Sequence, residues 1–159
     1  MKIILWLLFF IIIISDQITK SVVRNTLLVG ETIKIIGSFF QITHLENTGI
    51  AFGLLQGMNN ILIFINTIII ISLSLIFIKQ PIFNQNKLSK IAIILIISGA
   101  ISNLIDRIVI GKITDFLYFG IKGYYWPAFN LADSCITIGG ILLALSLLKV
   151  KKKTELNIG

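Results

Sequence analysis

The aspartates are the side chains of this 159-residue protein whose positions suggest chemistry. Asp16, Asp106 and Asp133 lie at or beside the ends of long apolar runs, and Asp115 lies between the last two of these runs. A carboxylate at the centre of a membrane helix costs about 2.5–3.5 kcal/mol on insertion scales, so four of them at one depth indicate a function. Two aspartates that share one proton form a general acid–base pair, in which one activates water and the other protonates the leaving group.

Asp115 and Asp133 are the two aspartates that we expect to form this pair. Lys112 is the only basic residue beside Asp115, and Asn130 lies one turn before Asp133 on the same helix face. The segment between them can return, so both carboxyl groups can meet at the membrane surface. Such a pair needs no metal or cofactor. The single histidine argues against a serine–histidine triad, and the single cysteine excludes a tetrahedral cysteine zinc site.

The other two aspartates have basic neighbours, which favours a structural role. Asp16 and Lys20 are four residues apart, so they share a helix face and can form an ion pair or contact a lipid headgroup. Asp106 and Arg107 follow Asn103 by three and four residues. We expect Asp106 and Arg107 to anchor a helix end by pairing locally and reaching phosphate headgroups.

Four apolar runs must position these residues, at 3–23, 61–78, 88–105 and 129–150. Each is close to the roughly 20 residues that a helix needs to cross the hydrocarbon core, where a backbone must satisfy its own hydrogen bonds. The chain is 56% hydrophobic and 13% charged, which is more apolar surface than a soluble protein of this length can bury. The sequence therefore predicts an all-α integral membrane protein with four transmembrane helices and one domain, 1–159.

The distribution of basic residues predicts the orientation of these helices. The net charge of +7 gathers on the face that carries both termini and the 79–90 connection. The basic residues of this face are Lys2, Lys79, Lys87, Lys90, Lys149, Lys151, Lys152 and Lys153. The positive-inside rule places this face in the cytoplasm. The basic excess is thus a topology signal and a contact for membrane phospholipids, and does not indicate nucleic acid.

Two segments lie on the opposite, extracytoplasmic side, at 24–60 and 106–128. In the first, residues 32–36 alternate, Gly37-Ser38 forms a turn, and 39–43 predicts a returning strand. We therefore expect a small β-containing extracytoplasmic element. The first apolar run resembles a signal peptide, but no small-residue cleavage site follows it, so we expect it to be retained.

Five motifs, in order along nearly the whole chain, resemble those of the lipoprotein signal peptidase (signal peptidase II) family. They are D-Q-I-T-K at 16–20, N-T-G-I-A-F at 47–52, N-L-I-D-R at 103–107, T-D-F at 114–116 and W-P-A-F-N-L-A-D at 126–133. One motif alone is weak, whereas five in this order are specific. The chain departs from the family where Ser98 and Ser102 replace common glycines, and serine is small enough for close helix packing.

This resemblance implies a membrane aspartic endopeptidase that cleaves prolipoproteins before a diacylglyceryl-modified cysteine, with Asp115 and Asp133 as the catalytic pair. The supporting residues that we expect are Asn47, Asn103, Arg107, Asn130, Asp16, Lys20 and Asp106. The implied partners are the lipidated prolipoprotein and membrane phospholipids. The implied location is the bacterial cytoplasmic membrane, with the active site outside, and we expect a monomer without a cofactor.

Two other classes of protein remain open at this point. A small proton- or cation-coupled transporter also uses intramembrane aspartates, although its acids should lie near mid-bilayer in both halves of a repeat, and no repeat is present here. A non-catalytic membrane scaffold could use the aspartates only as helix caps. Cleavage of a lipidated precursor peptide would separate the three classes.

Overall fold

Four helices of the computed structural model are long and apolar enough to cross a membrane. They are α1 (Lys2–Thr26), α2 (Asn59–Lys79), α4 (Lys87–Ile110) and α5 (Leu131–Leu156). The structure describes residues 2–50, 54–79 and 86–156. The four predicted spans are confirmed. The third helix, however, continues to Ile110, beyond its expected end at residue 105, so Asp106 lies within the helix and not at its end.

The outer surfaces of these helices are apolar. Large side chains with more than half of their surface exposed occur on all four helices, among them Trp6, Phe64, Ile108 and Leu148. An extended surface of this kind is unfavourable in water and is expected of helices that face lipid. The buried charged residues of the helices, Asp16, Lys20, Asp106 and Arg107, lie instead inside the bundle, so the fold separates them from the lipid-facing surface.

Helix α4 lies at the centre of the bundle and contacts α1, α2 and α5. Its N-cap is Asn86, whose side-chain oxygen accepts a hydrogen bond of 2.9 Å from Leu88 N, and its C-cap is Gly111 in the left-handed conformation with φ 76°. Both are standard helix-terminating features. Ser98 and Ser102, which stand where glycine is common in the family, are fully buried in α4, as expected for small residues at a helix contact.

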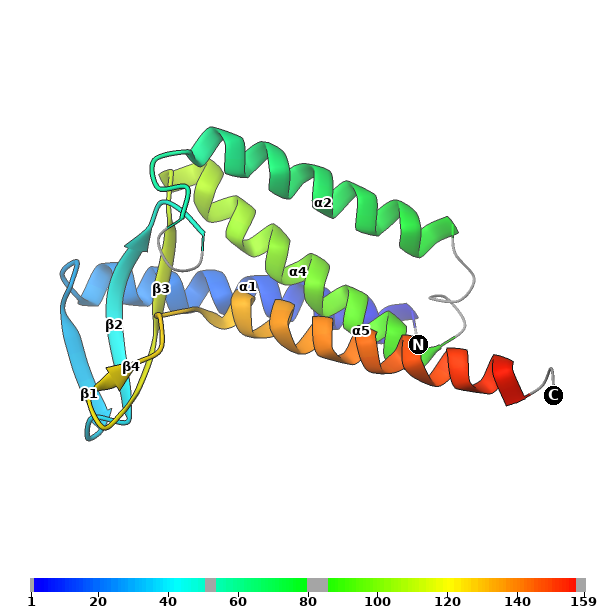
Figure 1. The fold of residues 1–159 in the computed structure, drawn as a ribbon. Helices are drawn as coiled ribbons and strands as arrows, with labels where there is room; N and C mark the ends of the chain where they lie inside the picture. Colours follow the sequence, from blue (N-terminus) through cyan, green and yellow to red (C-terminus); the bar gives the residue numbers. More distant parts are fainter. Residues whose placement is uncertain (1, 51–53, 80–85, 157–159) are drawn as a thin grey trace.

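A four-stranded antiparallel sheet lies across one end of the bundle (Figure 1). Its strands, in spatial order, are β1 (Thr32–Ile36), β2 (Phe40–Asn47), β3 (Ile113–Ile121) and β4 (Tyr124–Tyr125). The predicted β1–β2 hairpin is confirmed.

The second outer segment, 106–128, does not form the loop that we expected. It contains the last turn of α4 and strands β3 and β4, and it places Asp115 on a paired strand opposite Leu45. Besides β4, strand β3 pairs with β2, which precedes α2 in the sequence. Because β2 and β3 are far apart in the sequence, the local residue pattern did not predict that they pair.

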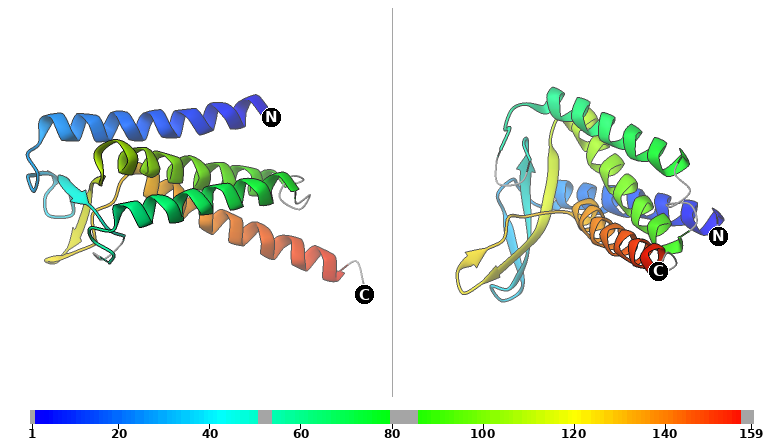
Figure 2. Two further views of the ribbon diagram at one scale, coloured as in Figure 1. Left: turned by 90° about the horizontal axis from the view of Figure 1, so that it is seen from above. Right: turned by 45° about the vertical axis from the view of Figure 1, so that its right-hand side comes forward.

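The two views of Figure 2 and the view of Figure 1 agree on how the chain is laid out. The start of α1, the end of α2, the start of α4 and the end of α5 lie at the end of the bundle away from the sheet. All four aspartates therefore belong to the sheet end. This is the arrangement that four spans with both termini on one side require.

The close approach of α4 and α5 depends on glycine. A Cβ atom at Gly99 would lie 2.5 Å from the carbonyl oxygen of Ala132 and 2.9 Å from Cγ1 of Ile136, whereas one at Gly140 would meet nothing within 4 Å. Contacts this short force one helix to shift. The backbone of α5 next to Asp133 can therefore lie this close to α4 only because Gly99 has no side chain.

We predict that Gly99→Ala lowers the stability of the purified protein by about 1–3 kcal/mol, because overpacking forces the two helices apart. The matched variant Gly140→Ala adds the same methyl group to open space and should leave the midpoint of thermal unfolding in detergent unchanged or slightly higher. Equal midpoints for the two variants would show that α4 and α5 do not need this contact.

Candidate active site

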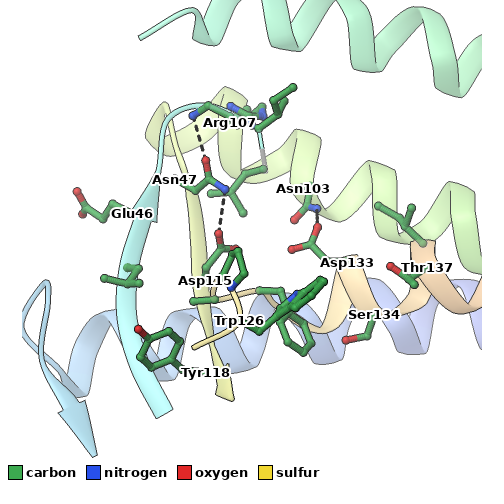
Figure 3. A pocket seen from close by; sticks show the side chains of 18 of the residues that line it. Glu46, Asn47, Asn103, Arg107, Asp115, Tyr118, Trp126, Asp133, Ser134 and Thr137 are labelled. Carbon is green, nitrogen blue, oxygen red and sulfur yellow. Dashed lines mark hydrogen bonds between the residues drawn. The ribbon is translucent and has the colours of Figure 1, made fainter. Parts of the chain in front are cut away.

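Asp115 and Asp133 line the same cavity, which has a volume of about 980 Å³ and lies where the sheet meets the helices. Asp115 extends from β3 and Asp133 from the first turn of α5, and Figure 3 shows their carboxyl groups in the same part of the cavity. Two carboxyl groups that the sequence separates are thus brought together, as we predicted. The cavity wall also contains Asn47, Asn103 and Arg107.

Neutral amides hold both carboxyl groups in place. Asn47 Nδ2 donates to Asp115 Oδ2 at 2.9 Å, and Asn103 Nδ2 donates to Asp133 Oδ1 at 2.8 Å (Figure 3). An amide donor orients a carboxylate without offering it a second ionisable proton. Among these hydrogen-bonded side chains, only the two carboxyl groups gain or lose a proton.

Asn130 connects the two aspartates directly. Its Nδ2 donates to Asp115 Oδ1 at 2.7 Å, while its Oδ1 accepts from Asp133 N at 2.9 Å. In return, Asp133 Oδ2 accepts from Asn130 N at 3.3 Å, so the two residues form a reciprocal cap at the start of α5. Asn130 is fully buried. The start of α5 and the orientation of Asp115 are consequently fixed by one side chain.

The environment of Asp115 favours its protonated form. Burial of the carboxyl group and, second to it, the negative charge of Asp133 raise its pKa from 3.8 to about 7, against the hydrogen bonds from Asn47 and Asn130. At neutral pH the pair can therefore hold one proton, and the apparent pKa belongs to the pair. This is the protonation that a general acid–base pair needs.

A second polar cluster lies beside the pair, around the fully buried ammonium group of Lys20. Lys20 Nζ lies 2.7 Å from Asp16 Oδ2, 3.1 Å from Asp106 Oδ2 and 2.8 Å from Asn103 Oδ1. The expected Asp16–Lys20 ion pair is confirmed, but both side chains are fully buried and cannot contact lipid headgroups. Because the amide of Asn103 also donates to Asp133, Asn103 links the Lys20 cluster to the Asp115–Asp133 pair.

Asp16 also holds the start of α5. Its Oδ1 accepts from Ala132 N at 2.9 Å, and its Oδ2 accepts from Ser102 Oγ at 2.7 Å. A carboxylate at a helix N-terminus satisfies a free backbone amide and interacts favourably with the helix dipole. Asp16 therefore ties α1 to the residue that precedes Asp133.

The expectation that Asp106 and Arg107 pair locally is wrong. Adjacent residues on a helix point in different directions, and α4 continues past both of them. Asp106 faces Lys20, whereas Arg107 faces the cavity, donates to the carbonyl of Gly49 and donates to Asn59 Oδ1 at 3.3 Å. Arg107 is also buried, at 3% exposure, so it does not reach phosphate headgroups.

Four residues of the site were missed at the sequence level. Gln17 Nε2 donates to Ser102 Oγ and to Asp106 Oδ1, both at 3.0 Å, and Arg24 Nη1 donates to Thr114 Oγ1 at 3.0 Å. Gln17 and Thr114 stand inside two of the quoted motifs. Ser102 was interpreted only as a small packing residue, although a serine at a glycine position could also have suggested a hydroxyl that bonds to a neighbouring carboxylate.

The fold and the site together define a multi-pass membrane protein with two carboxyl groups on the wall of one cavity, at one end of its helices. The part of the chain that the structure describes holds no cluster of three or more histidine, cysteine or carboxylate side chains suited to a metal ion. The chain belongs to the signal peptidase II family, because residues 8–149 match the model of signal peptidase (SPase) II. It is therefore a peptidase of the signal peptidase II class, as the five motifs indicated.

Individual relatives agree with this assignment. The lipoprotein signal peptidases of Staphylococcus aureus strains JH9 and Newman are each 41% identical over 138 residues, which cover 87% of this chain and 83% of theirs. A bacterial membrane enzyme determined by the in meso method at 2.3 Å resolution is 37% identical, with a TM-score of 0.86, over 94% of this chain and 90% of that chain. A second such structure, at 1.9 Å, is also 37% identical, with a TM-score of 0.78, over 91% and 92%.

We predict that Lys20→Met destabilises the protein by about 3–5 kcal/mol, because it leaves the buried Asp16 and Asp106 carboxylates without their common cation. Lys112→Met is the matched control. Lys112 lies 2.6 Å from Glu46, but the two side chains are 36% and 29% exposed, so its loss should cost about 0–1 kcal/mol. Thermal unfolding in detergent compares the two, and a Lys20→Met midpoint equal to that of Lys112→Met would contradict a structural role for the buried cluster.

Proposed function

We propose that this protein removes signal peptides from prolipoproteins by hydrolysing the peptide bond before a diacylglyceryl-modified cysteine, with Asp115 and Asp133 as the catalytic pair. The observation that carries this proposal is the pair of carboxyl groups, one of them with its pKa raised to about 7, on the wall of a cavity between sheet and helices. The relatives' name, lipoprotein signal peptidase, supports the choice of substrate.

The proposed reaction needs only one water molecule and the single proton of the pair. The ionised carboxylate removes a proton from water, whose oxygen attacks the scissile carbonyl carbon, while the protonated carboxyl group donates a hydrogen bond to the carbonyl oxygen. The carbon–nitrogen bond then breaks, and a proton from the pair goes to the departing amine of the cysteine. The products are a free carboxyl group and a free amine, and the pair again holds one proton.

The hydrogen bonds of the site prepare this chemistry. Asn47, Asn103 and Asn130 fix the direction of both carboxyl groups, so little reorganisation is needed when the substrate arrives. Arg107 does not form an ion pair with either aspartate, and its guanidinium is instead bonded to Gly49 and Asn59. A direct ion pair with Arg107 would lower the pKa of the carboxyl group and favour the form of the pair that holds no proton.

The cavity supports a substrate that straddles the membrane surface. Its wall includes Tyr118 and Trp126 from the sheet side and Ala100 and Ile136 from the helices. Acyl chains would lie among the helices and the mature chain would leave over the sheet. We propose a monomer in a bacterial cytoplasmic membrane, because one chain supplies both aspartates and all three asparagines, with membrane phospholipids around the apolar helix surfaces.

The orientation follows from the ends of the helices. Lys79 is the last residue of α2 and Lys87 the first of α4, and these helix ends lie away from the sheet, as do the start of α1 and the C-terminal part of α5, which contains Lys149. The positive-inside rule assigns that end to the cytoplasm. The two aspartates then face the extracytoplasmic side, where secreted prolipoproteins are presented.

We predict that Asp115→Asn and Asp133→Asn each abolish cleavage of a lipidated precursor peptide, because an amide can neither accept the proton of water nor replace the acid. Purified protein in lipid is assayed for release of the signal peptide. Glu46→Gln is the control, since Glu46 also lines the cavity but is paired with Lys112, and it should cleave at close to the normal rate. Near-normal turnover by either aspartate variant, with retained folding, would show that this pair is not catalytic.

A further inference from the structure

Asn66 is a carboxamide on the wall of the cavity, well inside the membrane-spanning part of α2. It lies seven residues after Asn59, the first residue of α2, and so about 10 Å further along the helix axis. Its neighbours along the helix are predominantly isoleucine, leucine and phenylalanine. A polar amide at this depth is costly unless something bonds to it.

Two hydroxyl groups of the same helix bond to its own backbone, whereas the Asn66 side chain does not. Thr67 Oγ1 donates to Ile63 O and Ser74 Oγ donates to Ile70 O, both at 2.8 Å. Within residues 2–50, 54–79 and 86–156, the Asn66 side chain makes no hydrogen bond, although it lines the cavity and is only half-buried. It therefore offers two N–H donors and a carbonyl oxygen to whatever occupies the cavity.

The depth of Asn66 relative to the aspartates follows from the packing of α2 and α4. Asn59 Nδ2 donates to Arg107 O at 3.0 Å, which sets these two residues at one level. The helices run in opposite directions, so seven residues onward on α2 and seven back on α4 lead to Asn66 and Ala100, both of which line the cavity. Asn66 is thus about one helical turn deeper than Asn103, whose amide bonds to Asp133.

This depth matches one polar part of the proposed substrate. The cysteine follows the scissile bond, and the glyceryl group on its sulfur carries two ester carbonyls that begin the acyl chains. With the scissile carbonyl at the aspartates, the nearer ester carbonyl follows about eight bonds later, through the cysteine, its sulfur and the glyceryl carbons. This flexible connection can place the ester one helical turn deeper, at the boundary between polar cavity and apolar helices. Ester carbonyls accept hydrogen bonds and donate none, which suits the N–H groups of Asn66.

We propose that Asn66 is a specificity-determining residue that donates a hydrogen bond to an ester carbonyl of the diacylglyceryl group. This inference rests on the proposed function. It explains why a carboxamide is placed on the cavity wall in a predominantly apolar helix. It also gives the enzyme a means to recognise the lipid by its linkage and not only by its apolar chains.

The test uses two precursor peptides of one sequence, whose cysteines carry either S-diacylglyceryl or S-dialkylglyceryl groups of equal chain length. The ether lacks the carbonyl oxygen. We expect the wild-type enzyme to cleave the ester about fivefold more efficiently in kcat/KM, which is the effect of one neutral hydrogen bond. Asn66→Leu should cleave both peptides at the rate that the wild type shows for the ether. Thr67→Val, which removes a neighbouring hydroxyl that bonds within the helix, should keep the ester preference.

Three results would overturn the inference. Equal wild-type rates for the two peptides exclude ester recognition and need no variant. Equal losses of Asn66→Leu on both peptides would instead assign Asn66 to a backbone carbonyl of the signal peptide, to a membrane phospholipid or to packing. Failure of the wild type to cleave either peptide would overturn the proposed function, and this inference with it, whereas the first two results leave the peptidase activity intact.

Discussion

The buried ammonium group of Lys20 is the constraint on which the rest of the structure depends. A cation inside an apolar bundle must be surrounded by acceptors, and here Asp16, Asp106 and Asn103 supply them from α1 and α4. Asp16 also accepts from Ala132 N, so the same cluster fixes the start of α5. Since the oxygen of Asn103 is occupied by Lys20, its NH₂ group must point the other way, toward Asp133. The ion cluster thus decides the direction of an amide in the active site.

The site separates charged groups from neutral ones. Lys20 is bonded to Asp16 and Asp106, and Arg107 is bonded to the Gly49 carbonyl and Asn59, so neither cation is bonded to the proposed catalytic aspartates. The residues that do bond to these aspartates are asparagines. Burial and mutual repulsion can therefore raise the pKa of Asp115 to about 7, and no direct ion pair reverses the effect.

The sequence was sufficient for features that depend on local pattern. Span length and polarity predicted all four helices, and alternation around Gly37-Ser38 predicted the first hairpin. Strand β3 was missed because its partner β2 lies far away in the sequence, and Asp115 was therefore expected in a loop. The direction of Asp106 and Arg107 was missed because it depends on where α4 ends and on which helices surround it. The family motifs named the asparagines, but only the structure shows that Asn130 contacts both aspartates.

The central claim is that Asp115 and Asp133 share one proton, and infrared titration of their carboxyl groups tests it most directly. The Asp115→Asn difference spectrum identifies the protonated carboxyl band. In the wild type this band should disappear with a midpoint near pH 7. In Asp133→Asn the midpoint should move to lower pH, because the negative charge that raises the pKa of Asp115 is gone. A wild-type midpoint near pH 4, or one that Asp133→Asn leaves unchanged, would contradict the account.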